Sequence, residues 1–419
     1  MSVKELIVNA GSSSLKYTLF LMPEKEVLCN GIFEQLCTKT PTFTHKLPDE
    51  NGDLKKVIDK MPIKEGAEHR EAIEILIDTL VGEEFGVLKS MDEIAAVGHR
   101  VLHGGEEFPN SVLITEEVKE SVRKCIPLGP LHVPANLTGI EVCESVMKDT
   151  PNVAVFDTAF HQTISKEAFM YALPYEYYEK YGIRRYGFHG TSHKYVSKRT
   201  TEFLMEKYPG KYNADELRVV TCHLGNGSSL SAVKGGKCVD TTMGLTPLEG
   251  IMMGTRSGSI DPAIIPFLME KEGLTAKEVD AILNKKSGML GLTSSDPNNE
   301  ATSDNRTIEG RAKAGDERAM LVEAMFCHQL TKLIGGFVAE MNGVDAVVFT
   351  GGIGENNPHY RSRVGAKFDF LGVKIDEEAN GVRGREIEIT TEDSPVKFLV
   401  IPTDEELMIA QDTYDITQK

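Results

Sequence analysis

The stretch "VNAGSSSLKY", residues 8–17, begins as an apolar strand, breaks at four small residues, and then returns to a strand-like pattern. Two strand-like runs this close together predict a β-hairpin. A Gly/Ser turn lets backbone N–H groups approach a ligand, and successive N–H groups form a concavity suited to phosphate oxygens. Lys16 would add a positive charge and Asn9 an oxygen for a hydrated metal. The alternative is a plain hairpin turn with a solvated lysine.

A second hairpin of the same kind lies in the other half of the chain. Residues 220–233, "VTCHLGNGSSLSAV", repeat the order of strand, Gly/Ser turn and strand. Two such hairpins in separate halves predict duplicated domains that face one another across a cleft. Chance similarity of two short hairpins is the alternative.

The rest of the chain mixes two periodicities, which predicts an α/β protein. Strand-like runs occupy residues 95–103, 152–158, 217–224, 345–350 and 397–403. Helical patterns lie between them and at the end, at residues 69–83, 319–342 and 404–417.

The bulk properties exclude several classes of partner. The 419 residues carry a formal net charge of −17, which disfavours nucleic acid and anionic membranes as partners. The seven cysteines are scattered without a C-x-x-C pair, which indicates reduced thiols in a cytosolic protein rather than disulfides or a zinc site. No stretch approaches the roughly 20 apolar residues of a membrane span. We therefore expect a cytoplasmic protein.

Two histidine pairs have the spacing of metal ligands on one face of a helix, but their surroundings do not favour a zinc site. His99/His103 and His189/His193 are four residues apart, but both pairs lie in glycine-containing segments that are not expected to be helical.

Two further motifs suggest an anionic ligand. In "VVFTGGIGENNP", residues 347–358, a strand runs into glycines before an expected helix start near residues 356–358, which would offer N–H groups to a nucleotide. The glycine-rich stretch 240–262 contains a single basic residue, Arg256, and Arg100 ends an apolar strand. Each arginine could hold an anion through its planar guanidinium or form a structural salt bridge.

Taken together, these motifs resemble those of the acetate kinase family. "VNAGSSSLKY" and "DTTMGLTPLEGIMMGTRSGSIDP" (240–262) are similar to its two signature stretches. "GHRVLHGGE" (98–106), "RRYGFHGTSH" (184–193), "HLGNGSS" (223–229), "FTGGIGEN" (349–356) and "IPTDEEL" (401–407) follow in the same order, so the resemblance covers essentially the whole chain. It implies two actin-like (ribonuclease-H-like) domains with mixed sheets flanked by helices and a nucleotide cleft between them. The first would comprise residues 1–157 and approximately 407–419, and the second, residues 158–406, would carry the nucleotide loops and the dimer contact.

The resemblance also implies site residues and an activity. A homodimer would transfer the ATP γ-phosphoryl group reversibly to acetate by direct in-line transfer, giving acetyl phosphate and ADP. The metal, Mg²⁺ with Mn²⁺ as an alternative, would be held by Asn9 and Glu405. The catalytic residues would be Arg100, Asp157, His189 and Arg256. The acetate site would comprise Arg100, Leu102, Leu131, Phe188 and Pro247. The ATP contacts would be Ser12, Ser14, Lys16, His223, Leu224, Gly225, Asn226, Gly227, Asp304, Asn305, Arg306, Gly352, Ile353, Gly354, Glu355 and Asn356.

Three positions depart from the family's pattern. The segment 293–310 is longer than usual and contains Ser-Asp twice; we place the family's S-D-x-R on residues 303–306. Asp404 stands where asparagine is usual. Leu102 replaces valine, which should tighten the acyl pocket; one methylene discriminates by about 1–3 kcal/mol, so this favours acetate without excluding propionate.

Elementary chemistry adds two expectations. Acetate is already ionised near pH 7, so no general base is needed, and Asp157 is better suited to orienting an arginine or a magnesium-bound water. Residues 403–406 fit a capping box from Thr403 to Glu406, which would leave Glu405 for the metal.

The alternative functions are a propionate or butyrate kinase, a non-catalytic nucleotide clamp, and a pyrophosphate-using enzyme.

Overall fold

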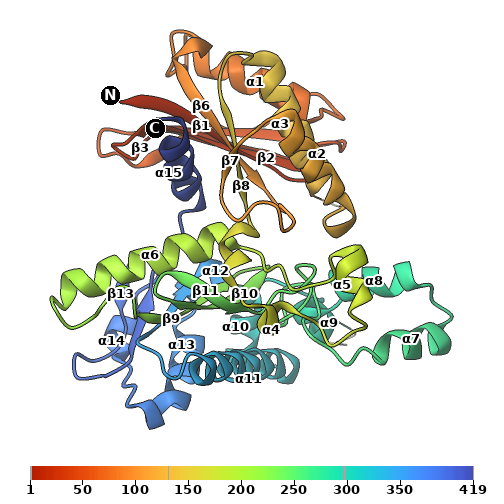
Figure 1. Ribbon diagram of the computed structural model, residues 1–419, viewed down its shortest axis with the longest axis vertical. Helices are drawn as coiled ribbons and strands as arrows, with labels where there is room; N and C mark the ends of the chain where they lie inside the picture. Colours follow the sequence, from red (N-terminus) through yellow and green to blue (C-terminus); the bar gives the residue numbers. More distant parts are fainter. Residues whose placement is uncertain (1, 131, 295, 297–298, 419) are drawn as a thin grey trace. The chain divides into compact units, whose positions relative to one another are not determined.

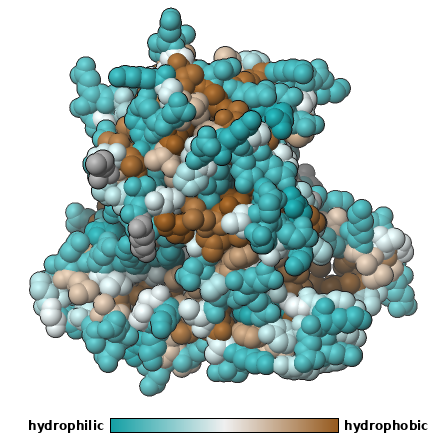
Figure 2. Space-filling view, turned by 45° about the horizontal axis from the view of Figure 1, so that its top comes forward, coloured by the Kyte–Doolittle hydropathy of each residue, from teal (hydrophilic) through white to brown (hydrophobic). Residues whose placement is uncertain are grey.

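The computed structural model describes residues 2–130, 132–294, 296 and 299–418. The chain divides into two compact units, Met1–Gln162 with Asp404–Lys419 and Thr163–Thr403. The seven cysteines, all within the described part of the chain, form no disulfide bond with one another. In the described part of the chain, no helix is long and apolar enough to cross a membrane. The face shown in Figure 2 is largely hydrophilic.

The first unit is built on an eight-stranded sheet of order β5-β4-β3-β2-β1-β6-β8-β7 (Figure 1). Its strands are β1 (Val3–Ala10), β2 (Ser14–Met22), β3 (Glu26–Glu34), β4 (Thr42–Pro48), β5 (Leu54–Pro62), β6 (Ile94–Val101), β7 (Val112–Leu113) and β8 (Asn152–Phe156). Its longer helices are α1 (His69–Val81), α2 (Glu116–Lys124), α3 (Val133–Val146) and α15 (Glu405–Thr417). Strands β1, β6 and β8 run parallel, whereas β1 to β5 form an antiparallel meander.

Residues 6–8 of β1 are buried although their side chains point to both faces of the sheet, which explains why all three are apolar. Leu6 and Val8 pack in a cluster with apolar residues of α1 and α3. Ile7 points to the opposite face, where it packs with Ile409 of α15. The period-2 alternation of the strand therefore divides its side chains between two helical layers.

The second unit repeats this plan around a six-stranded sheet of order β11-β10-β9-β12-β14-β13. Its strands are β9 (Arg218–Leu224), β10 (Ser228–Lys234), β11 (Lys237–Thr241), β12 (Ala346–Thr350), β13 (Ile387–Glu388) and β14 (Lys397–Val400). Its helices are α4 (Lys166–Phe169), α5 (Glu176–Tyr181), α6 (Gly190–Lys207), α7 (Ile264–Glu272), α8 (Ala276–Lys285), α9 (Gly288–Thr293), α10 (Asn305–Lys313), α11 (Glu317–Glu340), α12 (Gly351–Asn356), α13 (Pro358–Gly365) and α14 (Glu377–Asn380). Helices α11 and α6 cover opposite faces of this sheet (Figure 1).

The strand order confirms the duplication predicted from the two hairpins. In the first unit, antiparallel strands lie beside parallel strands in the order β3-β2-β1-β6-β8. The second unit has the same arrangement in the order β11-β10-β9-β12-β14. Each Gly/Ser turn thus joins the central strand of its sheet to the neighbouring antiparallel strand. Ligands of open α/β sheets bind at the carboxyl ends of parallel strands, and both turns lie at such an end.

Candidate active site

Hydrogen bonds with backbone groups and with one histidine stabilise the Gly/Ser turn of the first unit. The Gly11 amide donates to the Ser14 carbonyl at 2.8 Å, and the Leu36 amide donates to the Ser13 carbonyl at 2.9 Å. Nε2 of His69 lies 2.6 Å from the Gly11 carbonyl oxygen. Ser12 is exposed and Ser14 is half-buried. The turn therefore has a fixed shape and leaves a Ser hydroxyl group accessible to a ligand.

The strands on either side of the turn place Asn9 opposite Lys16 in the β1–β2 register. Lys16 is exposed and Asn9 is half-buried. The two residues assigned to the phosphates and the metal thus lie side by side at the root of the turn.

Arg100 and Asp157 form a bidentate ion pair at the carboxyl ends of β6 and β8. Nε of Arg100 donates to Oδ1 of Asp157 at 3.0 Å, and Nη2 donates to Oδ2 at 2.7 Å. The Asp157 side chain is 1% exposed and that of Arg100 is 25% exposed. Burial lowers the pKa of Arg100, but the carboxylates of Asp157 and Glu405 outweigh it and raise the pKa overall. The guanidinium is therefore fully charged and fixed in orientation.

Glu405 is the first residue of α15 and belongs to the same unit as Arg100. Burial raises its pKa, while the positive charges of Arg100 and Lys16 oppose this rise. Among the described residues, no hydrogen-bond or ion-pair partner is found for the side-chain amide of Asn9 or for the carboxylate of Glu405. These two oxygen donors fit Mg²⁺, which commonly takes one or two carboxylates and completes its shell with water and substrate phosphates. Among the residues that the structure describes, no cluster of three or more His, Cys, Asp or Glu side chains suggests another metal site.

The expected capping box at the start of α15 is wrong. Asp404, not Thr403, is the N-cap, and its carboxylate accepts a hydrogen bond from the Leu407 amide at 2.9 Å. The helix begins one residue later than the box requires, so Glu406 does not reach back to Thr403. The physical reason is that aspartate is itself a strong N-cap. Asp404 therefore has a structural role at this position.

The second unit contains a chain of hydrogen-bonded side chains that leads to His189. Nδ1 of His189 lies 2.8 Å from Oγ of Ser229, which lies 2.8 Å from Nε2 of His193. Nδ1 of His193 in turn contacts the Thr221 hydroxyl at 2.7 Å. His189 is the N-cap residue of α6 and has a φ of +57°, a left-handed conformation that is uncommon outside glycine. The expectation that this segment is not helical is wrong for His193, which lies in α6.

Arg256 and His189 border the same glycine. A Cβ atom at Gly227 would lie 3.3 Å from Nε2 of His189 and 3.6 Å from Nη1 of Arg256. Arg256 is half-buried and donates to the Pro247 carbonyl at 3.2 Å. Burial lowers its pKa, and among the described residues of this unit no carboxylate pairs with it. A cation, an imidazole and a bare backbone turn thus converge on one point, as a site for an anion requires.

The turn after β9 is held tightly by its own backbone. The Gly225 amide donates to the Gly227 carbonyl at 3.0 Å, and the Gly254 amide donates to the Asn226 carbonyl at 3.0 Å. The stretch that carries Arg256 is therefore attached directly to the turn that carries Gly227.

The other glycine loop differs from its prediction. Helix α12 begins at Gly351, directly after β12, and a second helix, α13, begins at Pro358 with Asn357 as its N-cap. A helix start was expected only near residues 356–358. Gly351 has a φ of +75°, and a Cβ there would lie 2.8 Å from the Leu224 carbonyl oxygen, so only glycine fits. The glycines thus make the close strand–helix junction rather than an open loop.

A buried arginine fixes the end of α12. The Arg361 side chain is fully buried and donates to the carbonyls of Gly354 and Glu355 at 2.8 and 2.9 Å. It also donates to Asn380 and to the Val382 carbonyl. Burial lowers its pKa to about 10, so it remains charged at neutral pH. Arg361 therefore holds the segment that carries the expected ATP contacts 352–356.

Asn305 connects two of the expected nucleotide segments. Its Nδ2 donates to the Tyr360 hydroxyl at 2.8 Å, and its Oδ1 accepts from Nδ2 of Asn357 at 2.9 Å. Asp304 caps α10 and pairs with the exposed Arg306 at 3.0 Å. Asp304 and Arg306 therefore lie on the surface, whereas the side-chain amide of Asn305 between them in the sequence is hydrogen-bonded to Tyr360 and Asn357.

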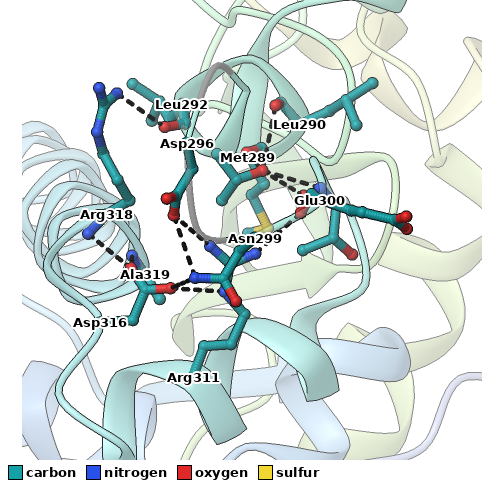
Figure 3. A network of polar contacts seen from close by, with 12 residues as sticks. Met289, Leu290, Leu292, Asp296, Asn299, Glu300, Arg311, Asp316, Arg318 and Ala319 are labelled. Carbon is teal, nitrogen blue, oxygen red and sulfur yellow. Dashed lines mark hydrogen bonds and ion pairs between the residues drawn. The ribbon is translucent and has the colours of Figure 1, made fainter.

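Figure 3 shows how the segment before Asp304 is attached. Nε of Arg311 donates to Asp316 at 2.6 Å, and its Nη2 donates to Asp296 at 3.0 Å. Asn299 donates to both carboxylates, and Arg311 also donates to the Glu300 carbonyl. The side chains of Arg311, Asp316 and Asp296 are 13%, 11% and 6% exposed. Asp296, Asn299 and Glu300 are thus joined to the α10–α11 junction by a mostly buried ionic network.

The residues expected around the acyl group are found in both units. Leu102 packs against Gly129, where a Cβ would lie 2.7 Å from its Cδ2 atom. Phe188 is buried directly before His189, and Pro247 is tied to Arg256. Leu131 lies outside the described residues.

Several supporting residues were not found from the sequence. They are His69, Asn136, His193, Ser229 and Arg361. Ser229 and His193 lie within quoted motifs, so their position was a usable signal. For Asn136 and Arg361, both on helices, nothing in the local pattern distinguishes them from other polar helix residues.

Known proteins that are similar to this chain share one family. A model described as the acetokinase family matches residues 4–411. A curated relative from Clostridioides difficile, named acetate kinase, is 52% identical over 98% of this chain and 99% of its own. One from Thermotoga maritima with the same name is 52% identical over 100% of this chain and 99% of its own.

Two solved structures are similar to the chain over nearly its whole length. The crystal structure of Porphyromonas gingivalis acetate kinase has a TM-score of 0.89 and 46% identity and covers 99% of both chains. A propionate kinase from Francisella tularensis has a TM-score of 0.86 and 39% identity over 99% of this chain and 100% of its own.

Proposed function

Because the chain belongs to the acetokinase family, we propose that the site described above transfers the ATP γ-phosphoryl group reversibly to acetate, giving ADP and acetyl phosphate. An ATP-dependent acetate phosphotransferase is the activity in the names of full-length relatives at 52% identity. The roles of individual residues, the metal and the in-line geometry are our proposal.

The observation that carries this proposal is Arg256, a half-buried guanidinium that pairs with no carboxylate among the described residues of its unit and that borders Gly227 together with Nε2 of His189. Two anions must meet in this reaction, and a chain of charge −17 offers them no general attraction. Phosphoryl transfer runs through a loose transition state, so positioning and local charge stabilisation supply most of the catalysis. Arg256 and His189 would stabilise the charge on the transferred group.

Arg100 would bind the acetate carboxylate, and Asp157 would hold Arg100 in orientation. The bidentate pair leaves Nη1 as the terminal nitrogen that does not face Asp157. The ion pair supports a positioning role for Asp157, since ionised acetate needs no general base. The acyl methyl group would contact Leu102, Leu131, Phe188 and Pro247.

For the nucleotide, we propose that Ser12, Ser14 and Lys16 bind the phosphates. The remaining contacts would be made by His223, Leu224, Gly225, Asn226, Gly227, Asp304, Asn305, Arg306, Gly352, Ile353, Gly354, Glu355 and Asn356. Asn9 and Glu405 would hold Mg²⁺, or Mn²⁺ in its place, which when bound neutralises phosphate charge.

We also propose a cytoplasmic homodimer that contacts its partner copy through the second unit. Cysteines that form no disulfide bond suit a reducing compartment. The second unit exposes several large apolar side chains, including Leu173, Tyr181 and Phe267. Light scattering of the purified protein tests the oligomeric state, and a monomeric mass would contradict the dimer.

The activity is tested by incubating the protein with Mg-ATP and acetate, propionate or butyrate, and trapping acyl phosphate with hydroxylamine. Hydroxamate formed fastest from acetate supports the proposal. A preference for propionate would indicate the activity named for the Francisella tularensis structure. ATP binding without hydroxamate from any acid would favour a non-catalytic clamp, and activity with pyrophosphate in place of ATP would overturn the nucleotide assignment.

A further inference from the structure

Strands β1 and β6 separate at the end of the first unit's sheet where the reacting groups lie. Their parallel register extends to Val8 opposite His99. Ala10 and Leu102 lie beyond this last pair, and a third element, helix α3, spans the gap between them.

The bridge is the side chain of Asn136. Its Nδ2 donates to the Ala10 carbonyl at 2.7 Å, and its Oδ1 accepts from the Leu102 amide at 3.0 Å. The residue is 5% exposed. A primary amide offers a donor and an acceptor on one planar group, and the fixed polarity of the two backbone partners determines which atom is the nitrogen. Asn136 thus fastens two segments that no strand pairing joins.

Both segments carry proposed reacting groups. Ala10 lies between Asn9 and the Gly/Ser turn, and Leu102 follows Arg100 by two residues. On the next turn of α3, Gly139 lets the helix approach closely, because a Cβ there would lie 2.9 Å from the Cβ of Ala10. Helix α3 therefore contacts Ala10, the residue directly before the turn, at two points.

We propose that Asn136 is a positioning residue that sets the distance between the phosphate turn with its metal ligand Asn9 and the acetate-binding segment of Arg100 and Leu102. This inference rests on the proposed function. Phosphoryl transfer depends on alignment of the two substrates, and a displacement of about 1 Å can reduce turnover about 100-fold. Asn136 touches no reacting atom and acts through the backbone of both segments.

Asn152 provides a matched control in the same unit. It is 6% exposed, its Oδ1 accepts from Nε2 of His99 at 2.7 Å, and its Nδ2 donates to the Thr150 carbonyl at 2.9 Å. It is the first residue of β8, at the opposite end of the strand from Asp157. Asn136→Leu and Asn152→Leu each remove one buried amide with two hydrogen bonds, so they should lower the melting temperature to a similar extent.

The turnover of the two variants should differ. With saturating Mg-ATP and acetate, Asn136→Leu should lose about 100-fold in kcat, whereas Asn152→Leu stays within about threefold of wild type. Asn136→Asp keeps the acceptor for the Leu102 amide but loses the donor to Ala10, and it covers the case in which the leucine variant does not fold. It should lower kcat and weaken Mn²⁺ binding in the presence of ADP, measured by electron paramagnetic resonance.

Equal kcat values for the folded Asn136 and Asn152 variants, or unchanged kcat and Mn²⁺ affinity in Asn136→Asp, would overturn the inference. Either result with an active wild-type enzyme leaves the proposed function intact. A wild-type protein that forms no acyl phosphate would instead overturn the proposed function itself.

Discussion

Asp157 holds the guanidinium of Arg100 by two hydrogen bonds of 2.7 and 3.0 Å, although the two residues are 57 positions apart in the sequence. The carboxylate is almost completely buried, so its charge is directed at one partner. In this account Asp157 orients Arg100 and transfers no proton.

Asp157→Asn tests this role, because it keeps the shape of the side chain and removes its charge. We expect kcat to fall about 100-fold, since Arg100 loses its orientation. The shape of the rate profile between pH 5.5 and 8.5, measured by hydroxamate formation, should remain unchanged. Loss of a single acidic limb from that profile in the variant would identify Asp157 as a base and contradict the account.

The size of the acyl pocket is tested at Leu102. Leu102→Val removes one methylene, so the ratio of kcat/KM for propionate to that for acetate should rise roughly tenfold. Leu102→Met has a similar volume and serves as the control, with a ratio within about threefold of wild type. If both variants shift the ratio equally, Leu102 does not limit the pocket.

The cap of α15 is tested at Asp404, whose carboxylate accepts from the Leu407 amide. Asp404→Ala should cost about 1 kcal/mol of stability. For a unit of this size that corresponds to a fall in melting temperature of about 2–4 °C in calorimetry. Asp404→Asn retains a cap and should melt close to wild type. An equal loss in both variants would mean that the charge, not the cap, stabilises this position.

Glu5 should make the stability of the first unit depend on pH. It is fully buried on β1, and neither carboxylate oxygen has a hydrogen-bond partner among the described residues. Burial, and secondarily the charge of Asp415, raise its pKa from 4.5 to about 8. The folded state therefore keeps a proton that the unfolded state has lost between these two pH values.

Because the folded pKa is the higher one, the stabilisation is complete below the unfolded pKa and is lost as pH rises. Glu5 should lower the free energy of unfolding by about 1.4 kcal/mol for each pH unit between about 5 and 8. Glu5→Gln should abolish this part of the slope in melting curves recorded from pH 5 to 9. Parallel curves for wild type and variant would show that Glu5 does not titrate in this range.

The strands and the duplication could be predicted because they follow from local periodicity. The expected runs 217–224 and 345–350 correspond to Arg218–Leu224 and Ala346–Thr350. Helix boundaries next to glycine could not be predicted from the sequence. Thr350 provides no side-chain cap for α12, and Gly190 is an unfavourable first residue for α6. In both cases packing on the sheet outweighs local propensity.

The residues of the candidate site could be proposed from motifs, but their partners could not. The Arg100–Asp157 pair depends on the parallel register of β6 with β8, in which Arg100 lies opposite Val155. The bridge by Asn136 depends on where α3 packs. Both are long-range contacts that no window of the sequence contains.

The most direct test of the account is phosphorus NMR of the reverse reaction, with saturating acetyl phosphate and Mg-ADP, for wild type and Arg256→Ala. Saturation isolates the chemical step from substrate binding. The account predicts that ATP resonances grow with wild type and at least about 100-fold more slowly with the variant, because a cation that stabilises the transferred phosphoryl group is gone. ATP formed at the wild-type rate by Arg256→Ala, or no ATP from wild type, would contradict it.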